Sequence, residues 1–197
     1  MKFKILLIFL VLAAALVLFG CGEEEVQQNP ELAVQQLFEA TVELDIERAR
    51  SYISSNYQAQ YDREFAEVAD IFEEGGDEAE FLRTIYDAFF DSVDLQTVGH
   101  NVDGDSATVD IAVSIPDMDE FGDAFMGAMF ELMFSEDVDV EAMTEEEVML
   151  LMSDMIKDVI KDVSKVERSG VVQLVMEEGQ WKVDSDFLAD IFDEMDF

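Results

Sequence analysis

Basic residues, cysteine and histidine are scarce in this sequence of 197 residues. It holds 11 lysines and arginines against 47 aspartates and glutamates, with one cysteine and one histidine. Nucleic-acid binding needs Lys and Arg to neutralise phosphates, so this composition excludes nucleic acid as a partner. A lone cysteine excludes an intrachain disulfide, and with a lone histidine it cannot supply a zinc site. We therefore expect neither an intrachain disulfide nor a zinc site.

Apolar residues are abundant, because 50% of the chain is hydrophobic and it contains 16 phenylalanines. That apolar surface is enough to offset the entropy of ordering, so a folded core is expected. The net charge of -36 is spread along the whole chain. We interpret it as a solvated acidic shell suited to a salty exterior. Cation sequestration and a basic partner are the alternatives.

The first 20 residues begin with two lysines, continue as an uncharged apolar run and end on glycine. This pattern predicts a secretory signal, because the run is too short for a comfortable membrane span. Leu18, Gly20 and Cys21 resemble the lipobox of bacterial lipoprotein signals. The resemblance implies cleavage between Gly20 and Cys21 and a diacylglycerol on the sulfur of Cys21.

The lipobox resemblance also implies a location and a domain division. The chain is expected to be extracytoplasmic and anchored to the cell membrane, since two or more acyl chains hold a protein stably. Residues 1–20 are then the signal peptide, 21–29 the lipidated cysteine with an acidic tether, and 30–197 a single domain. An uncleaved membrane helix at residues 1–20 is the alternative.

Apolar residues at helical spacing mark the first half of the domain. Asn29 and Asp45 are each expected to cap a helix, the second one short. Two more helices are predicted over residues 61–72 and 81–89, separated by a Gly-Gly pair.

Strict alternation replaces this spacing in the second half. Residues 106–115 predict a half-buried strand. Its apolar face is Ala107, Val109, Ile111, Val113 and Ile115. Residues 93–100 are its expected partner, joined to it through a turn at Asp103 and Gly104.

A second hairpin is predicted over residues 169–185. Its turn is expected around Gly179, with Trp181 and Val183 facing inward.

Two helices are predicted between the hairpins, over residues 118–134 and 144–163. The second opens with a capping box of Thr144 and Glu147. The order predicts an α+β fold, in which N-terminal helices pack on a curved antiparallel sheet made of two hairpins, with a two-helix insertion between them.

The opening helix "PELAVQQLFEATVELDIERARSYI" and the closing hairpin "EEGQWKVD" resemble bacterial lipoprotein domains of unknown function. Those domains have a nuclear-transport-factor-2-like, cystatin-related fold, which implies a cone with an apolar pocket. The similarity covers most of residues 30–185. The long insertion and a short helix after Ser185 depart from that pattern.

No catalytic constellation is evident. A lone His100 beside a turn lacks the partner that a general base needs. Residues 103–110 alternate aspartates but lack the later ligands and the glycine of a calcium-binding loop. Relatives of the fold move protons with a carboxylate and tyrosines. The tyrosines here are Tyr52, Tyr57, Tyr61 and Tyr86. No acid can be assigned to them, so we expect no enzyme, cofactor or metal.

Methionine is concentrated in the insertion, where eight of the 11 lie between residues 118 and 155. It suits irregular cores and adaptable apolar binding surfaces. Residues 121–134 carry only Asp123 and Glu131 as charges, so this helix is apolar on most of its circumference. The candidate contact residues are Phe121, Phe125, Met126, Met129, Phe130, Met133 and Phe134. Core packing, a lid over the sheet and contact with a ligand or another subunit are the alternatives.

These features predict a lipid-anchored extracytoplasmic binding module. Its partner would be an apolar small molecule or a protein of the envelope. The alternative is a structural or assembly protein that self-associates, for example as a homodimer, through the Met- and Phe-rich insertion.

Overall fold

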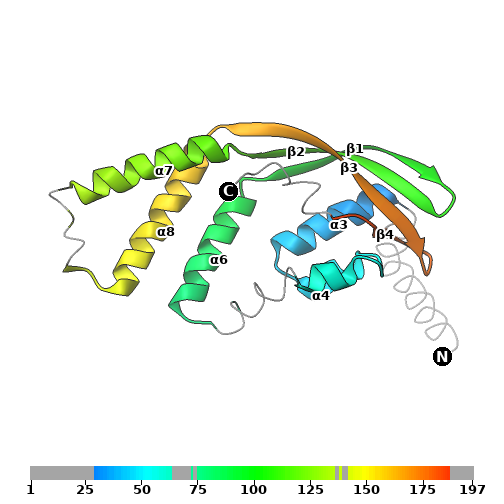
Figure 1. Cartoon of the computed structure of the whole chain (residues 1–197), viewed down its shortest axis with the longest axis horizontal. Helices are drawn as coiled ribbons and strands as arrows, with labels where there is room; N and C mark the ends of the chain where they lie inside the picture. The colour runs from blue at the N-terminus through cyan, green and yellow to red at the C-terminus, as the bar shows by residue number, and fades with distance from the viewer. Residues whose placement is uncertain (1–28, 64–71, 73–74, 136–137, 139–141, 187–197) are drawn as a thin grey trace, which may run out of the picture.

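The computed structural model describes residues 29–63, 72, 75–135, 138 and 142–186. The predicted α+β class is confirmed, since helices precede one hairpin and two further helices separate it from a second (Figure 1). The helices are α3 (Pro30–Val42), α4 (Ile46–Ser51), α6 (Asp77–Phe90), α7 (Met118–Met133) and α8 (Glu145–Asp162). The strands are β1 (Asp94–Asp103), β2 (Ser106–Pro116), β3 (Lys165–Glu177) and β4 (Gln180–Val183).

Several predicted segments lie outside the described residues. They are the signal peptide and tether with Gly20 and Cys21, most of the predicted helix 61–72, and the segment after residue 186.

The helices begin where the sequence places their caps. The Asn29 side chain accepts a hydrogen bond from the N–H of Glu31 at 2.9 Å, and Asp45 accepts one from the N–H of Arg48 at 3.0 Å. Thr144 caps α8 in the predicted capping box. These contacts satisfy N–H groups that have no partner inside the helix.

The core lies between α3 and one face of the sheet. The four strands are antiparallel in the order β1-β2-β3-β4, and the sheet curves over α3 (Figure 1). The predicted apolar face of β2 is buried along its length, and Trp181 and Val183 of β4 are buried beside it. Helix α3 contributes four residues to the core, namely Ala33, Val34, Leu37 and Ala40.

The first hairpin turn differs by one residue from the prediction. Asp103 pairs with Ser106, so the loop consists of Gly104 and Asp105 rather than Asp103 and Gly104. Gly104 has φ +62°, a conformation that glycine adopts without steric cost. The aspartate is therefore the last residue of the strand.

Helices α6, α7 and α8 form a part of the fold beyond the end of the sheet (Figure 1). Helix α6 packs chiefly on α8, where Ala79, Ile156 and Ile160 are buried. Helix α7 continues away from the end of β2 and does not cross the sheet, so the lid alternative is wrong. The first turn of α7 is joined to the start of β3 by the N–H of Ser164, which donates to Glu120 at 2.9 Å.

Candidate functional site

One side of α7 is apolar and exposed. Four of the seven candidate residues are more than half exposed, namely Met126 (54%), Phe130 (53%), Met133 (67%) and Phe134 (78%). Their spacing of four, three and one residues places them on one side of a helix. We call these four residues the α7 face. The rings of Phe130 and Phe134 stack on each other with centroids 6.5 Å apart.

The other three candidates form a separate line along α7. Phe121, Phe125 and Met129 are half-buried and four residues apart. The rings of Phe121 and Phe125 stack with centroids 5.8 Å apart. Helix α7 packs on α8, but none of its residues is buried. Core packing therefore does not account for this helix.

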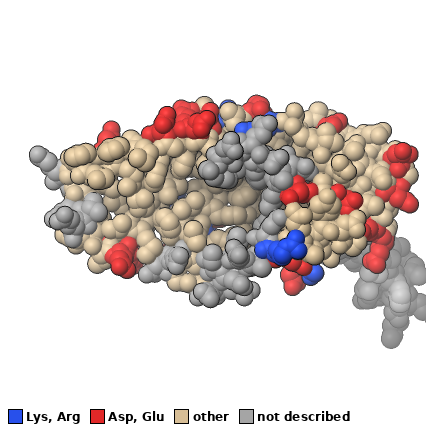
Figure 2. All heavy atoms as spheres, viewed as in Figure 1, with Lys and Arg blue, Asp and Glu red and all other residues tan. Residues whose placement is uncertain are grey.

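The charges on α7 are all acidic. The exposed Asp119 and Asp123 lie two turns and one turn before Met126 on the same side, and Glu131 lies next to Phe130. The helix contains no basic residue. Acidic groups also outnumber basic ones over the visible face of the molecule (Figure 2). The α7 face is thus an apolar stripe beside negative charge.

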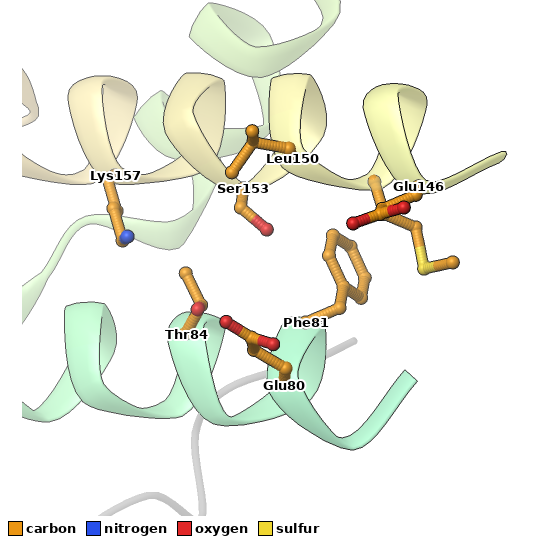
Figure 3. Close-up of a pocket in the computed structure, with 8 residues that line it drawn as sticks. Glu80, Phe81, Thr84, Glu146, Leu150, Ser153 and Lys157 are labelled. Carbon is orange, nitrogen blue, oxygen red and sulfur yellow. The ribbon is translucent and has the colours of Figure 1, made fainter. Parts of the chain in front are cut away.

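A cleft of about 310 Å³ separates α6 from α8 (Figure 3). Its lining is Glu80, Phe81 and Thr84 from α6 and Glu146, Met149, Leu150, Ser153 and Lys157 from α8. These positions fall on one side of each helix. Side chains from both helices point toward the space, with Lys157 at one end and Glu146 at the other (Figure 3). We call this space the α6–α8 cleft.

Of the four tyrosines, Tyr86 joins two helices and Tyr61 is buried in the core. The hydroxyl of Tyr86 on α6 donates to the carbonyl oxygen of Thr41 at the end of α3. Burial raises the pKa of Tyr86 well above its ordinary value, and burial with the nearby Asp62 does the same for Tyr61. Phenols held in the neutral form are poor general bases at neutral pH.

Buried carboxylates are absent from the described residues. The buried polar side chains there are Thr41, Ser54, Ser153 and Ser185. Within the same ranges, no three acidic, histidine or cysteine side chains are grouped so that they could hold a metal ion.

His100 has a structural contact. Its Nδ1 lies 2.6 Å from Oε1 of Glu31, so β1 is joined to the first turn of α3 at the surface. Gln35 adds a second link by donating to the hydroxyl of Thr97 at 2.8 Å.

The chain matches no protein-family model and no curated protein. Among solved structures it is similar to the crystal structure of YcdA, a candidate lipoprotein of Bacillus subtilis, with 15% sequence identity and a TM-score of 0.44. The alignment covers 70% of this chain and 44% of that one, so the chain spans less than half of that protein's length. The nuclear-transport-factor-2-like resemblance stays a prediction.

A helix that crosses a bilayer needs about 20 predominantly apolar residues. In the part of the chain that the structure describes, none of the helices has the length and apolar character needed to cross a bilayer.

The sequence predicted the α7 face but not the α6–α8 cleft. Glu80 and Lys157 lie in helices separated by the whole first hairpin. No local pattern indicates that the side of α6 that carries Glu80 faces the side of α8 that carries Lys157.

Proposed function

We propose that this chain is a lipid-anchored extracytoplasmic binding module whose α7 face contacts a protein partner. The observation that carries the proposal is the exposure of four large apolar side chains on one side of a helix. Contiguous apolar patches of this kind mark interaction sites more often than scattered apolar residues do. The proposal includes no catalytic step.

A protein surface fits the α7 face better than a small molecule does. Small ligands bind in concave sites that cover most of their surface. No α7 residue lines the α6–α8 cleft, and the four side chains of the α7 face stand outward on a helix. Helices presented in this way dock into grooves through side chains at spacings of three and four.

The acidic surroundings favour a partner with basic residues around an apolar centre. Asp119, Asp123 and Glu131 would face such residues across the interface. A second copy of the chain would instead bring like charges together, which is unfavourable unless salt screens them. Self-association through the same face is therefore the second candidate, and we expect it only at high ionic strength.

The anchor is tested by removing the thiol. We expect the Cys21→Ser variant to move from the membrane fraction to the soluble extracellular fraction. Mass spectrometry of the mature N-terminal peptide should find a diacylglycerol adduct on Cys21 in the unaltered chain. If the variant stays in the membrane fraction and the unaltered chain carries no adduct, the result would support the uncleaved-helix alternative.

The partner is tested by photo-crosslinking in the native host. A photoreactive phenylalanine analogue replaces Phe130, and the matched control places it at Asp158, an exposed position on α8. We expect a crosslinked adduct from position 130 and none from position 158. The peptide that the partner protein contributes to this adduct should contain apolar residues flanked by Lys or Arg. That adduct should disappear when Phe134→Ser is added. Adducts confined to a second copy would support assembly instead.

A further inference from the structure

The α6–α8 cleft holds opposite charges that do not pair with each other. Lys157 is half-buried at one end, Glu146 lies at the other end beyond Phe81 and Leu150, and the Glu80 carboxylate lies between them beside Thr84 (Figure 3). In the part of the chain described, Lys157 takes part in none of the hydrogen bonds or ion pairs. The structure thus leaves an ammonium group facing the cleft in a chain that has 47 acidic residues.

The middle of the cleft is apolar with hydroxyl groups beside Lys157. Phe81, Met149 and Leu150 supply the apolar surface. Thr84 and Ser153 lie between the ring of Phe81 and the ammonium of Lys157 (Figure 3), and Ser153 is 5% exposed. A few polar groups on an apolar lining are typical of small-molecule sites, and 310 Å³ is at the small end of their range.

This arrangement of charges selects against ligands with a single charge. A simple anion would be attracted by Lys157 but repelled by the two glutamates and by the negative charge of the whole chain. A simple cation would be attracted by the glutamates and by the ring of Phe81 but repelled by Lys157. A molecule with one charge of each sign and an apolar middle matches both ends.

We propose that the α6–α8 cleft binds a small zwitterion, with its carboxylate at Lys157 and its ammonium at Glu146. The hydroxyl group of Ser153 donates to the carboxylate, and the apolar middle of the ligand lies on Phe81 and Leu150. The site is independent of the proposed α7 partner, because no cleft residue belongs to α7.

The test titrates the full chain, labelled with ¹³C at the methionine methyl groups, with ω-amino acids of increasing length. The probes are 4-aminobutanoate, 6-aminohexanoate and 8-aminooctanoate, compared with hexylamine and hexanoate. We expect a saturable shift of the Met149 methyl signal but not of Met126 on the α7 face. The best zwitterion should bind about tenfold more tightly than either single-charge probe, which corresponds to one charge-assisted contact.

Variants assign the two ends of the ligand. Lys157→Gln should lower the affinity for the best zwitterion about tenfold and leave that for hexylamine no weaker. Glu146→Gln should lower the affinity for the zwitterion and for hexylamine but not that for hexanoate. The matched controls Lys161→Gln and Asp87→Asn change exposed residues of the same helices outside the cleft, and they should leave all affinities unchanged.

The comparison of probes on the unaltered chain does not depend on any variant folding. Hexylamine or hexanoate binding as tightly as every zwitterion would overturn the proposal. So would the lack of a saturable shift with all five probes at about 10 mM, a concentration that detects millimolar binding.

Discussion

The rings of Phe130 and Phe134 stack with their planes 7° apart, although both side chains are more than half exposed. The two rings contact each other one helical turn apart, and neither is buried. Burial of apolar surface stabilises by about 25 cal/mol per Å², and here that contribution is not used within the chain. It is available to a partner, which is the basis of the function proposed above.

Substitutions on the α7 face should therefore leave the fold intact. We expect Phe130→Ser and Phe134→Ser to change the free energy of unfolding by no more than about 0.5 kcal/mol, as for other exposed positions. Leu37→Ala in the core should cost about 2–5 kcal/mol. Urea unfolding followed by circular dichroism measures both. A loss of about 2 kcal/mol for Phe130→Ser would place that ring in a packed interior.

Salt should stabilise the chain because its net charge of -36 destabilises the compact state by self-repulsion. Screening acts over about 10 Å at 0.1 M and over shorter distances at higher concentrations. We expect the melting temperature to rise similarly in molar NaCl and molar KCl. A melting temperature that stays flat in both salts would refute the interpretation as salt adaptation. A rise caused by millimolar CaCl₂ alone would favour cation binding.

Stability should fall at alkaline pH. Burial raises the pKa of Tyr61 and Tyr86 above the value of about 10 that they have in the unfolded chain. Above about pH 10 the unfolded chain loses protons that the folded chain retains, so the free energy of unfolding decreases as pH rises. The double variant Tyr61→Phe/Tyr86→Phe should show a shallower decrease between about pH 10 and 11.5. The same slope in both chains would show that these hydroxyls ionise normally when folded.

The capping box should stabilise α8, which forms one wall of the α6–α8 cleft. The Thr144 hydroxyl accepts from the N–H of Glu147 at 3.2 Å, and the Glu147 carboxylate accepts from the N–H of Thr144 at 2.8 Å. We expect Thr144→Ala to cost about 1 kcal/mol in the free energy of unfolding. Glu147→Gln should cost less, because an amide oxygen can still accept that bond. Equal losses in the two variants would contradict this assignment.

The sequence predicted the features that depend on local chemistry. Asn29, Asp45 and Thr144 cap the helices that they were expected to cap, and the alternation of residues 106–115 gave the buried face of β2. Each of these depends on residues a few positions apart, where helix and strand periods act directly.

Features that depend on distant contacts were not predicted. The packing of α6 on α8 and the cleft between them bring together segments on either side of the first hairpin. The composition of α7 indicated an unusual apolar helix, but core packing and exposure give the same local pattern. The structure separates the exposed residues Met126 and Phe130 from the half-buried Phe121 and Phe125.

Oxidation of methionines by dilute peroxide tests the central claim most directly, because it reports whether the α7 face is covered. Rates would be compared between native membranes and the purified Cys21→Ser chain at low concentration, with the half-buried Met149 as an internal reference. Our account predicts rapid oxidation of Met126 and Met133 in the purified chain and several-fold slower oxidation in membranes, with Met149 unchanged. Equal rates for Met126 and Met133 in the two preparations would mean that nothing binds this face.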